Sequence, residues 1–306
     1  MSNLLYYPII TGPTAVGKSE LSLALSERIN GAIICADSRQ VYKYINIGTA
    51  KPSKEDRIRV PHVLFDIYDL QYSYSVVQYA DDICNAINKC IDDNLHPVIT
   101  GGSTLYIHAL THGFPSTGPP DSSLREELKL LLAKDGLIKL QQRLSDLDPK
   151  ALSQVDQFNP IRVIRAIEIV ETSGLPLRDA VSSPRILPFS FKLFVLSRPR
   201  QELYDRINKR VDTMVQSGLI GEVQAFVDCG LANNPILNRT IGYQEPLAFI
   251  RGEITYENMI HLLKRNTRRY AKRQLTWFRN KENPVWIDAK LPLNTQIDLI
   301  IEHLYK

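Results

Sequence analysis

Residues Gly12 to Ser19 have the types and spacing of a loop that binds phosphate. They match the pattern G-x-x-x-x-G-K-[ST], in which backbone N–H groups cradle an anion at the N-terminal end of a helix. Lys18 would add a point charge, and the Ser19 hydroxyl would be a ligand for Mg²⁺. The loop predicts a site for a diphosphate or a longer phosphate chain, but it does not identify the reaction. The predicted phosphate-binding residues are Gly12, Pro13, Thr14, Ala15, Val16, Gly17, Lys18 and Ser19.

The sequence around this loop supports the prediction. An apolar run through Ile9 and Ile10 precedes the loop, and Leu21, Ala24 and Leu25 follow it at helical spacing. A strand, a glycine-containing loop and a helix therefore come in the order that the motif requires. A chance match in a glycine-bearing turn is the alternative, and this context disfavours it.

Asp37 is a second residue that could do chemistry. It follows the apolar run AIICA and is expected at the end of a strand. A carboxylate there could bind a ribose, hold Mg²⁺ through water or act as a general base. The same residue could instead cap the N-terminus of a helix, and the residue type alone leaves these alternatives open.

A basic stretch near the C-terminus could bind nucleic acid. Residues 261–281 contain eight Lys and Arg and no acidic residue, with Tyr270, Trp277 and Phe278 interleaved. Basic side chains that contact phosphates, next to aromatic rings that stack on unpaired bases, are typical of single-stranded RNA recognition. A solvated helix face with its aromatic residues in the core would give the same pattern. The basic residues are Lys264, Arg265, Arg268, Arg269, Lys272, Arg273, Arg279 and Lys281.

The whole chain has the composition of an ordinary globular protein. Its 306 residues are 44% hydrophobic and 23% charged, with a net charge of +4, so the total charge does not by itself indicate a polyanionic partner. The four cysteines form no C-x-x-C pair, which disfavours a disulfide framework or a zinc ribbon. No signal peptide is recognised, and no apolar run approaches the roughly 18 residues of a membrane span. We therefore expect a cytoplasmic protein that does not enter a membrane.

Further strand-like runs place the candidate residues in one fold. Residues 31–37, 96–102 and 191–197 are rich in apolar and β-branched residues, with helical stretches between them. This pattern predicts an α/β fold: a doubly wound parallel sheet that carries the P-loop, with a smaller helical insertion domain. Ligands of such sheets bind at the carboxyl ends of the strands. Gly12–Ser19, Asp37 and Gly101–Thr104 are therefore expected to meet in one crevice.

Two Pro, Gly and Ser-rich segments suggest the domain boundaries. The segments HGFPSTGPPDSS and VSSPRILPFS enclose a stretch of helical periodicity. We predict a helical insertion domain at residues 114–185, within a core domain of residues 1–113 and 186–306. After the insertion, the chain is expected to form one strand and then only helices from Gln201 to the end.

Several uncommon strings carry a resemblance to a known family. They are ADSRQVYKYINIGTAKPS, VPHVLFDI, GGSTLYI, NPIRVIRAIEIVETSG, RINKRVDTMVQSGLIGEVQAF, RTIGYQE and RNTRRYAKRQLTWFRN. In this order they resemble the tRNA dimethylallyltransferases, or bacterial-type tRNA isopentenyltransferases, which prenylate an adenine 3′ of the anticodon. The resemblance spans nearly the whole chain and is far more specific than a phosphate-binding loop alone.

The resemblance implies a reaction and roles for the residues. The loop would hold the diphosphate of dimethylallyl diphosphate, with Mg²⁺ on Ser19, and Asp37 would accept a proton from the exocyclic amine of adenine. Arg206 and Arg210 match positions that the family keeps basic, and at least one should reach the diphosphate, although a solvated helix face is the alternative. The protein is expected to act as a monomer. The implied catalytic residues are Asp37, Lys18, Thr14, Arg206 and Arg210.

The resemblance also implies an interface for the anticodon stem-loop of tRNA. One visible departure lies in GGSTLY, where Thr104 replaces a glycine, so the backbone must avoid a strongly left-handed φ there. The implied tRNA-binding residues are Asp37, Ser38, Arg39, Gln40, Ser103, Arg125, Ile161, Arg162, Val163, Ile164, Arg165, Arg239, Thr240, Ile241, Gly242, Tyr243, Gln244, Lys272, Arg273, Gln274, Leu275, Thr276, Trp277, Phe278 and Arg279.

Three other functions are compatible with parts of the sequence. A small-molecule kinase would use the loop for ATP, but it has no use for a basic, aromatic C-terminal helix. An adenylate prenyltransferase would share the donor and accept a free nucleotide, and the helical insertion argues against it. A non-catalytic RNA-binding module could use the loop as a switch, and Asp37 would then be dispensable.

Overall fold

The computed structural model describes residues 6–115, 117, 121–280 and 284–305. The chain divides into two compact units. Unit 1 contains residues 1–111 and 188–306, and unit 2 contains residues 112–187. The predicted insertion at 114–185 begins and ends within two residues of unit 2.

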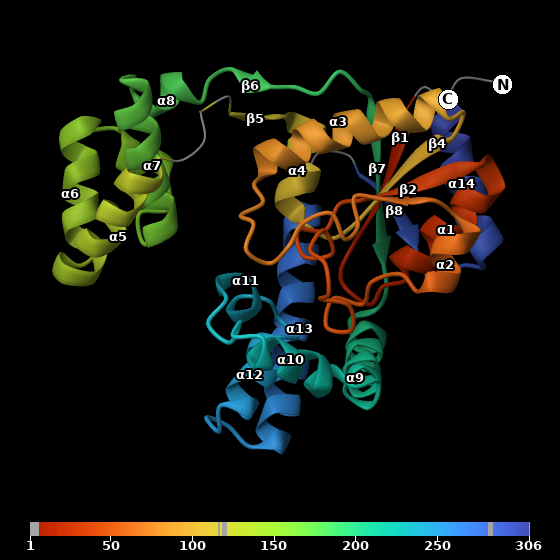
Figure 1. Cartoon of the computed structure of the whole chain (residues 1–306). Helices are drawn as coiled ribbons and strands as arrows, with labels where there is room; N and C mark the ends of the chain where they lie inside the picture. Colours follow the sequence, from red (N-terminus) through yellow and green to blue (C-terminus); the bar gives the residue numbers. More distant parts are fainter. Residues whose placement is uncertain (1–5, 116, 118–120, 281–283, 306) are drawn as a thin grey trace. The chain divides into compact units, whose positions relative to one another are not determined.

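Unit 1 is built on a six-stranded parallel sheet, in the order β3-β2-β4-β1-β7-β8 (Figure 1). The central strands are buried apolar runs, as expected for a parallel sheet covered on both faces. Ile9 of β1 lies opposite Ile99 of β4, and Ile33 of β2 lies opposite Val98. The strands are β1 (Tyr7–Thr11), β2 (Gly31–Cys35), β3 (His62–Val63), β4 (His96–Thr100), β7 (Phe191–Ser197) and β8 (Val285–Asp288).

Helices cover both faces of this sheet, which confirms the predicted doubly wound α/β fold. Figure 1 shows α1 and α14 on one face, and α3 and α4 on the other. Leu21 and Leu25 of α1 share a hydrophobic core with Ile300 of α14 and Phe194 of β7. The helices are α1 (Lys18–Ile29), α2 (Lys54–Arg59), α3 (Val76–Asp92), α4 (Thr104–His112), α9 (Arg200–Gln216), α10 (Leu219–Asp228), α11 (Pro235–Asn238), α12 (Gln244–Ile250), α13 (Tyr256–Arg279) and α14 (Leu293–Tyr305).

The prediction of only helices after Gln201 is wrong, because β8 extends the sheet at its edge. This strand pairs with β7 through Phe194 and Val285, and through Leu196 and Ile287. It has four residues, and its Trp286 side chain is exposed, so it lacks the long buried run that identified the central strands. Strand β3, with two residues, was missed for the same reason. Short edge strands depend on the neighbouring strand for their formation, and a local pattern does not reveal that neighbour.

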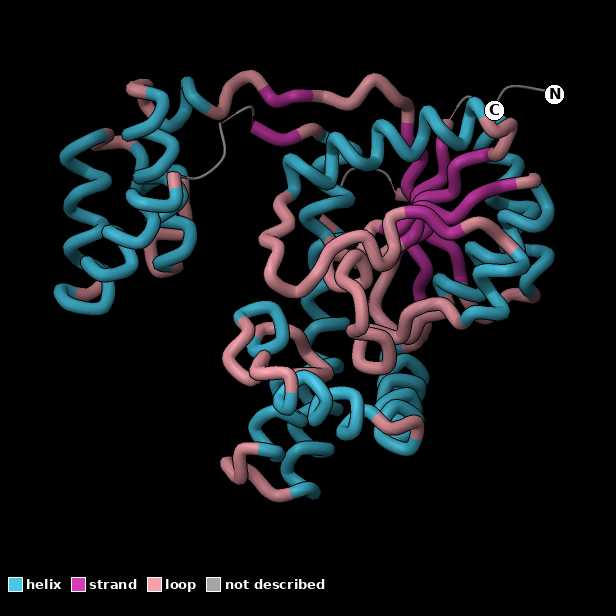
Figure 2. Tube along the Cα trace, in the orientation of Figure 1, coloured by secondary structure: helices cyan, strands magenta, loops and turns pink. Residues whose placement is uncertain are grey.

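A second core orders the long loop that follows β2. Figure 2 shows this region as loop, close to the helices that follow β7. Val41 and Ile45 of the loop are fully buried against Val211 of α9 and Leu263 of α13. Glu222 of α10 accepts hydrogen bonds from the backbone N–H groups of Asn46 and Ile47, at 3.1–3.3 Å. The helices α9–α13 therefore fix the loop that begins at Asp37.

Unit 2 is a small helical body with a two-stranded antiparallel ribbon. Its core includes Leu128, Leu140, Leu144 and Ile167. Asn159 caps α7 by accepting hydrogen bonds from two backbone N–H groups, and Gly174 ends the helix in a left-handed conformation. The elements are β5 (Phe114–Pro115), α5 (Ser122–Asp135), α6 (Leu137–Leu147), a 3₁₀ helix (Ala151–Gln154), α7 (Pro160–Ser173), α8 (Leu177–Ala180) and β6 (Pro184–Arg185).

Glu168 of α7 is a fully buried carboxylate that two arginines neutralise. Arg125 contacts it with two nitrogens, at 2.5 and 2.7 Å, and Arg165 lies 3.2 Å from it.

We expect Glu168→Ala to lower the free energy of unfolding by about 2–3 kcal/mol. This loss is below the ~3–5 kcal/mol for breaking a fully buried pair, because both arginines are partly exposed to water. Chemical denaturation would measure it, with Asp156→Ala as the control, because Asp156 and Arg162 form only an exposed pair at 4.0 Å. An equal loss in both variants would contradict the prediction.

Candidate active site

The three predicted segments meet at the carboxyl ends of three neighbouring strands. Gly12 follows β1, Gly101 follows β4, and Asp37 lies just after β2. The Thr11 hydroxyl donates a hydrogen bond to the Gly101 carbonyl at 2.8 Å. A Cβ atom on Gly101 would lie 2.1 Å from the Ala36 carbonyl oxygen, so only glycine allows this close approach. The crevice expected from the sequence is therefore present.

The phosphate-binding loop has the backbone that its motif requires. Gly12 has a φ of +137°, and a Cβ atom there would lie 2.7 Å from the Leu196 carbonyl oxygen. Gly17 has a φ of +123°, and no side chain caps the N-terminus of α1, which begins after it. The first N–H groups of α1 are therefore left for a ligand, at the positive end of the helix dipole.

Basic side chains hold the carbonyl groups of this loop. Lys18 Nζ donates to the carbonyl oxygens of Gly12 and Pro13, at 3.1 and 3.0 Å. Arg206 Nε donates to the carbonyl oxygen of Ala15 at 2.9 Å, and Arg198 Nε donates to that of Val16 at 2.9 Å. Arg206 thus lies against the loop in this structure. The sequence did not single out Arg198, although it directly follows β7.

The positive charge near the loop is not fully compensated. The pKa of the Lys18 ammonium is lowered to about 8, chiefly by burial and also by the charge of Arg210, while the charge of Asp37 opposes both effects. Burial also lowers the pKa of the Arg210 guanidinium, with Asp37 raising it and Arg206 lowering it. Such a cluster of partly buried cations favours an anionic ligand.

The Lys18 pKa predicts how affinity for a diphosphate should change with pH. The free protein loses the Lys18 proton near pH 8, whereas a bound diphosphate would raise this pKa. Affinity should be constant below pH 8 and then fall by up to about tenfold per pH unit, because binding above pH 8 must take up a proton. Titration of dimethylallyl diphosphate between pH 7 and 9.5 would measure this fall. Lys18→Arg is the control, since arginine keeps its charge, and parallel pH profiles for the two proteins would contradict the prediction.

Asp37 uses one carboxylate oxygen to organise its own turn. Oδ1 accepts hydrogen bonds from the backbone N–H groups of Arg39, at 2.8 Å, and Gln40, at 3.4 Å. No helix begins at this residue, so helix capping does not describe its role. Among the described residues, none donates a hydrogen bond to the second oxygen, Oδ2. Asp37 is thus oriented through one oxygen, while the other remains able to accept a proton.

Neighbouring residues hold the Asp37 turn in place. The Ser103 hydroxyl accepts a hydrogen bond from the Ser38 backbone N–H at 2.9 Å. The Gln40 amide donates to the carbonyl oxygens of Thr49 and Ala50, at 2.8 and 3.3 Å. Thr104 begins α4 and has no positive φ, as the Gly-to-Thr departure required.

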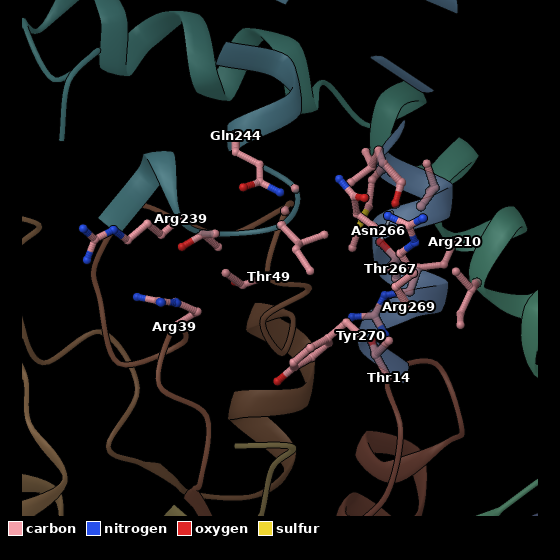
Figure 3. Close-up of a pocket in the computed structure, with 18 of the residues that line it drawn as sticks. Thr14, Arg39, Thr49, Arg210, Arg239, Gln244, Asn266, Thr267, Arg269 and Tyr270 are labelled. Carbon is pink, nitrogen blue, oxygen red and sulfur yellow. Dashed lines mark hydrogen bonds between the residues drawn. The ribbon is translucent and has the colours of Figure 1, made fainter. Parts of the chain in front are cut away.

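Two cavities adjoin this turn within unit 1. The loop cavity, of about 370 Å³, contains Lys18, Ser19, Gly101 and Gly102. The wide cavity, of about 520 Å³, contains Arg39, Arg239, Arg269 and Arg273. Figure 3 shows Arg39 and Arg239 on one side of the wide cavity and Arg210 and Arg269 on the other. The residues that line both cavities are Thr14, Asp37, Thr49, Arg210 and Tyr270.

Nine of the predicted tRNA-binding residues of unit 1 line the wide cavity. It is lined by Asp37, Ser38, Arg39, Arg239, Thr240, Ile241, Gly242, Gln244 and Arg273. Three others have buried side chains: Tyr243 and Phe278 pack in the core, and Ser103 is nearly covered. The structure therefore does not offer these three side chains to a large ligand. Thr49, Asn266 and Thr267 also line the cavity, and no motif in the sequence pointed to them.

Some basic side chains of helix α13 bind other residues of the protein, and others are exposed. Lys264 pairs with Asp212 at 2.6 Å, and Arg268 donates to the Asn208 side chain at 2.6 Å. Trp277 is half-buried and lies edge-on to His108, with 6.3 Å between the ring centroids. Other basic side chains are exposed and remain candidates for phosphate contact: Arg269, Lys272, Arg273 and Arg279. Lys281 lies outside the described residues.

The remaining predicted tRNA-binding residues belong to unit 2, the separate compact unit of residues 112–187. Arg162 and Ile161 are exposed, at 64% and 71%. Val163 and Ile164 pack in the core of unit 2, so their side chains are not available. Arg125 and Arg165 are held by Glu168, which the sequence did not single out.

Within residues 6–115, 117, 121–280 and 284–305, no three His, Cys, Asp or Glu side chains gather as a metal-binding group. Among the described helices, none combines the length and apolar character that a membrane crossing needs.

Comparison with known proteins places this arrangement in a family. The model of the IPP transferase family matches residues 40–281. A tRNA dimethylallyltransferase of Salinibacter ruber is 41% identical over 90% of this chain and 86% of its own length, and one of Thermotoga neapolitana is 39% identical over 97% and 96%.

Solved structures show the same relationship. The tRNA isopentenylpyrophosphate transferase of Bacillus halodurans has a TM-score of 0.72 and 38% identity, over 98% of this chain and 95% of its own. A eukaryotic dimethylallyltransferase acting on tRNA has a TM-score of 0.77 and 26% identity, over 93% and 74%. Because the family model matches residues 40–281, which is more than half of the chain, this chain belongs to the IPP transferase family.

Proposed function

We propose that this protein transfers the dimethylallyl group of dimethylallyl diphosphate to the exocyclic amine of the adenine 3′ of the anticodon in tRNA, releasing diphosphate. The relatives named tRNA dimethylallyltransferase support this function. The observation that carries it is the position of Asp37, which lines both the loop cavity and the arginine-rich wide cavity. A carboxylate at that junction can serve a donor on one side and an acceptor on the other.

The loop cavity is suited to the donor. Lys18 and the uncapped N-terminus of α1 would bind the diphosphate, and Arg210 would add a second cation. Negative charge accumulates on the diphosphate as its C–O bond breaks, so these groups stabilise the transition state more than the bound donor. An allylic carbon tolerates the matching partial positive charge.

Asp37 is suited to accept the proton. The amine nitrogen forms a bond to the allylic carbon, the C–O bond to diphosphate breaks, and the amine proton passes to the carboxylate. An aromatic exocyclic amine is a weak nucleophile because its lone pair is delocalised, so positioning and a proton acceptor both matter. Oδ2 is the oxygen we assign to this step, since Oδ1 is held by the Arg39 and Gln40 N–H groups.

Mg²⁺ fits the oxygen groups of the loop cavity. Ser19 is exposed and lines this cavity together with Asp37. Mg²⁺ usually keeps several waters and binds through one or two protein oxygens and the substrate phosphates, so it needs no protein cage. When bound, it would neutralise charge on the diphosphate oxygens. Ser19 would hold it, and Asp37 could contribute through water.

The wide cavity is suited to the acceptor. An unpaired loop base leaves its stack at low cost, so the target adenine can be turned out towards Asp37. Arg39, Arg239 and Arg273 could contact neighbouring phosphates. We further assign Ile161, Arg162 and the Glu168-held arginines of unit 2 to the anticodon arm. Action as a monomer in the cytoplasm is part of the same proposal.

Transfer of a labelled prenyl group tests the function. Incubation with labelled dimethylallyl diphosphate and an unmodified anticodon stem-loop should move the label into the RNA. The matched RNA with inosine in place of the target adenine should remain unlabelled, because inosine lacks the amine. Label in free adenosine monophosphate instead would favour a nucleotide prenyltransferase, and phosphate transfer from ATP would favour a kinase. Either result would overturn the proposal.

The exposed face of α13 should supply part of the RNA affinity. We expect the triple variant Arg269→Gln, Lys272→Gln and Arg273→Gln to weaken stem-loop binding and to reduce the log–log salt slope by about 2, at about 0.7 per phosphate contact. Titration at several salt concentrations measures this slope. Lys290→Gln, an exposed change outside both cavities, should leave it unchanged. An unaltered slope in the triple variant would show that this face is only solvated.

A further inference from the structure

Gln274 of α13 is a buried amide that joins two loops of the active site. Its side chain is 2% exposed. Oε1 accepts a hydrogen bond from the Thr14 backbone N–H at 2.9 Å, and Nε2 donates to the Gly102 carbonyl oxygen at 2.8 Å. Thr14 belongs to the phosphate-binding loop, and Gly102 follows β4. The sequence suggested a tRNA contact for Gln274, but both ends of its amide are bound inside the protein.

The backbone around Gln274 is shaped for this amide. A Cβ atom on Gly102 would lie 2.4 Å from Nε2, so glycine is needed for the approach. The Tyr270 hydroxyl, one turn earlier in α13, lies 3.5 Å from the same Gly102 carbonyl oxygen. The inner face of the helix is thus fastened to the loops after β1 and β4. A buried amide with two good partners rigidifies its surroundings, because losing either partner is costly.

Exposed basic side chains lie on the same helix beside this inner face. Arg269 and Arg273 line the wide cavity, and the Arg273 guanidinium lies over the Tyr270 ring, 5.8 Å from its centroid. Gln274 directly follows Arg273 in one continuous helix. A shift or ordering of α13 by RNA on its basic face therefore reaches the Thr14 N–H through a single side chain.

We propose that Gln274 is a positioning residue that couples the two substrate sites. It holds the phosphate-binding loop at Thr14 when α13 is docked, so RNA bound on α13 strengthens diphosphate binding in the loop. By thermodynamic linkage, diphosphate strengthens RNA binding by the same factor. This inference rests on the proposed function, because it assigns RNA to the wide cavity and diphosphate to the loop cavity.

Binding measurements on the whole protein test the coupling. The dissociation constant of inorganic diphosphate is measured by calorimetry at pH 7.5, with and without saturating unmodified stem-loop RNA. For the wild type we expect RNA to tighten diphosphate binding by about tenfold, within the usual range of coupling. The coupling ratio is the dissociation constant of diphosphate without RNA divided by the constant with RNA. In Gln274→Met, which keeps the length of the side chain but loses both hydrogen bonds, this ratio should fall to about one. Its RNA affinity without diphosphate should stay within about twofold of the wild type.

A second variant and a matched control separate coupling from stability. Gly102→Ala changes the partner of Gln274 and should also remove the coupling, because the added methyl group displaces Nε2. This variant provides the test if Gln274→Met does not fold. Gln296→Met is the control. Gln296 is also buried and donates to a backbone carbonyl, that of Leu291 at 2.7 Å, but it lines neither cavity. A loss of stability in this variant with an unchanged ratio would support the specific role of Gln274.

The outcomes distinguish the two proposals. If the wild type transfers the prenyl group to RNA but shows a ratio of one, or if folded Gln274→Met keeps the wild-type ratio, the coupling is wrong and the function stands. If the wild type binds no RNA, both fail. If it binds both ligands with coupling that Gln274→Met removes, yet transfers no prenyl group, only the proposed reaction fails.

Discussion

Asp37→Asn is expected to lose prenyl transfer by about 10²–10⁴-fold while still folding and binding both substrates. The amide keeps an oxygen that can accept the Arg39 and Gln40 N–H bonds, so the turn should persist. It cannot take the amine proton, and the loss should match the usual contribution of a general base. Because the proton is transferred only during reaction, the defect should appear in kcat and leave the substrate affinities nearly unchanged.

Single-turnover transfer from labelled dimethylallyl diphosphate to the stem-loop measures this loss. Asp69→Asn is a matched control, because Asp69 is an exposed carboxylate in the loop after β3 and pairs with Lys43 at 3.4 Å. It should transfer at the wild-type rate. Wild-type transfer by Asp37→Asn would exclude Asp37 as the base, and it would favour the alternative in which this residue only shapes the turn.

Lys18→Ala should be the next most damaging change, with transfer falling by about 10²–10³-fold. This is the range for removing one preorganised group that stabilises developing negative charge. Lys18 also holds the carbonyl oxygens of Gly12 and Pro13, so part of the effect would come from a less ordered loop. Diphosphate affinity should fall as well, since in the proposed reaction the ammonium would contact the donor both before and during bond breaking.

Comparing the two ligands shows whether the loop has been assigned to the right substrate. In Lys18→Ala, diphosphate titration should show weaker binding, whereas the stem-loop should bind as in the wild type. Lys54→Ala, which changes an exposed lysine at the start of α2, is the control and should alter neither. A variant that lost RNA binding and kept its diphosphate affinity would show that the loop serves the RNA.

The sequence predicted the elements that depend on local rules. The loop at Gly12–Ser19 was recognisable because its glycines, its lysine and the following helix have fixed spacing. The central strands were recognisable because they are continuous buried runs, and their common direction placed Asp37 and Gly101 beside the loop. The family resemblance depended on short sequence segments that occur in a fixed order along the chain, so it required no knowledge of the packing.

The sequence was misleading where a residue's role depends on a distant partner. Strand β8 exists because β7 lies beside it. Tyr243 and Phe278 were grouped with their exposed neighbours, yet their side chains point into the core. Lys264 and Arg268 were listed in the basic stretch as candidates for phosphate contact, but they bind Asp212 and Asn208 within the protein.

The sequence by itself thus determined the phosphate-binding loop, the parallel sheet and the family, since these depend on residues close together in the chain. Tertiary structure alone decided which side chains of α13 face the cavity and which bind the protein. Gln274 meets Thr14 across 260 residues and Gly102 across 172. Among the residues that the structure describes, those two backbone groups are the hydrogen-bond partners of the amide. Their approach is set by the folded sheet and by the lack of a side chain at Gly102. No local pattern encodes that geometry, because the burial that makes the amide rigid arises only when all three segments pack together.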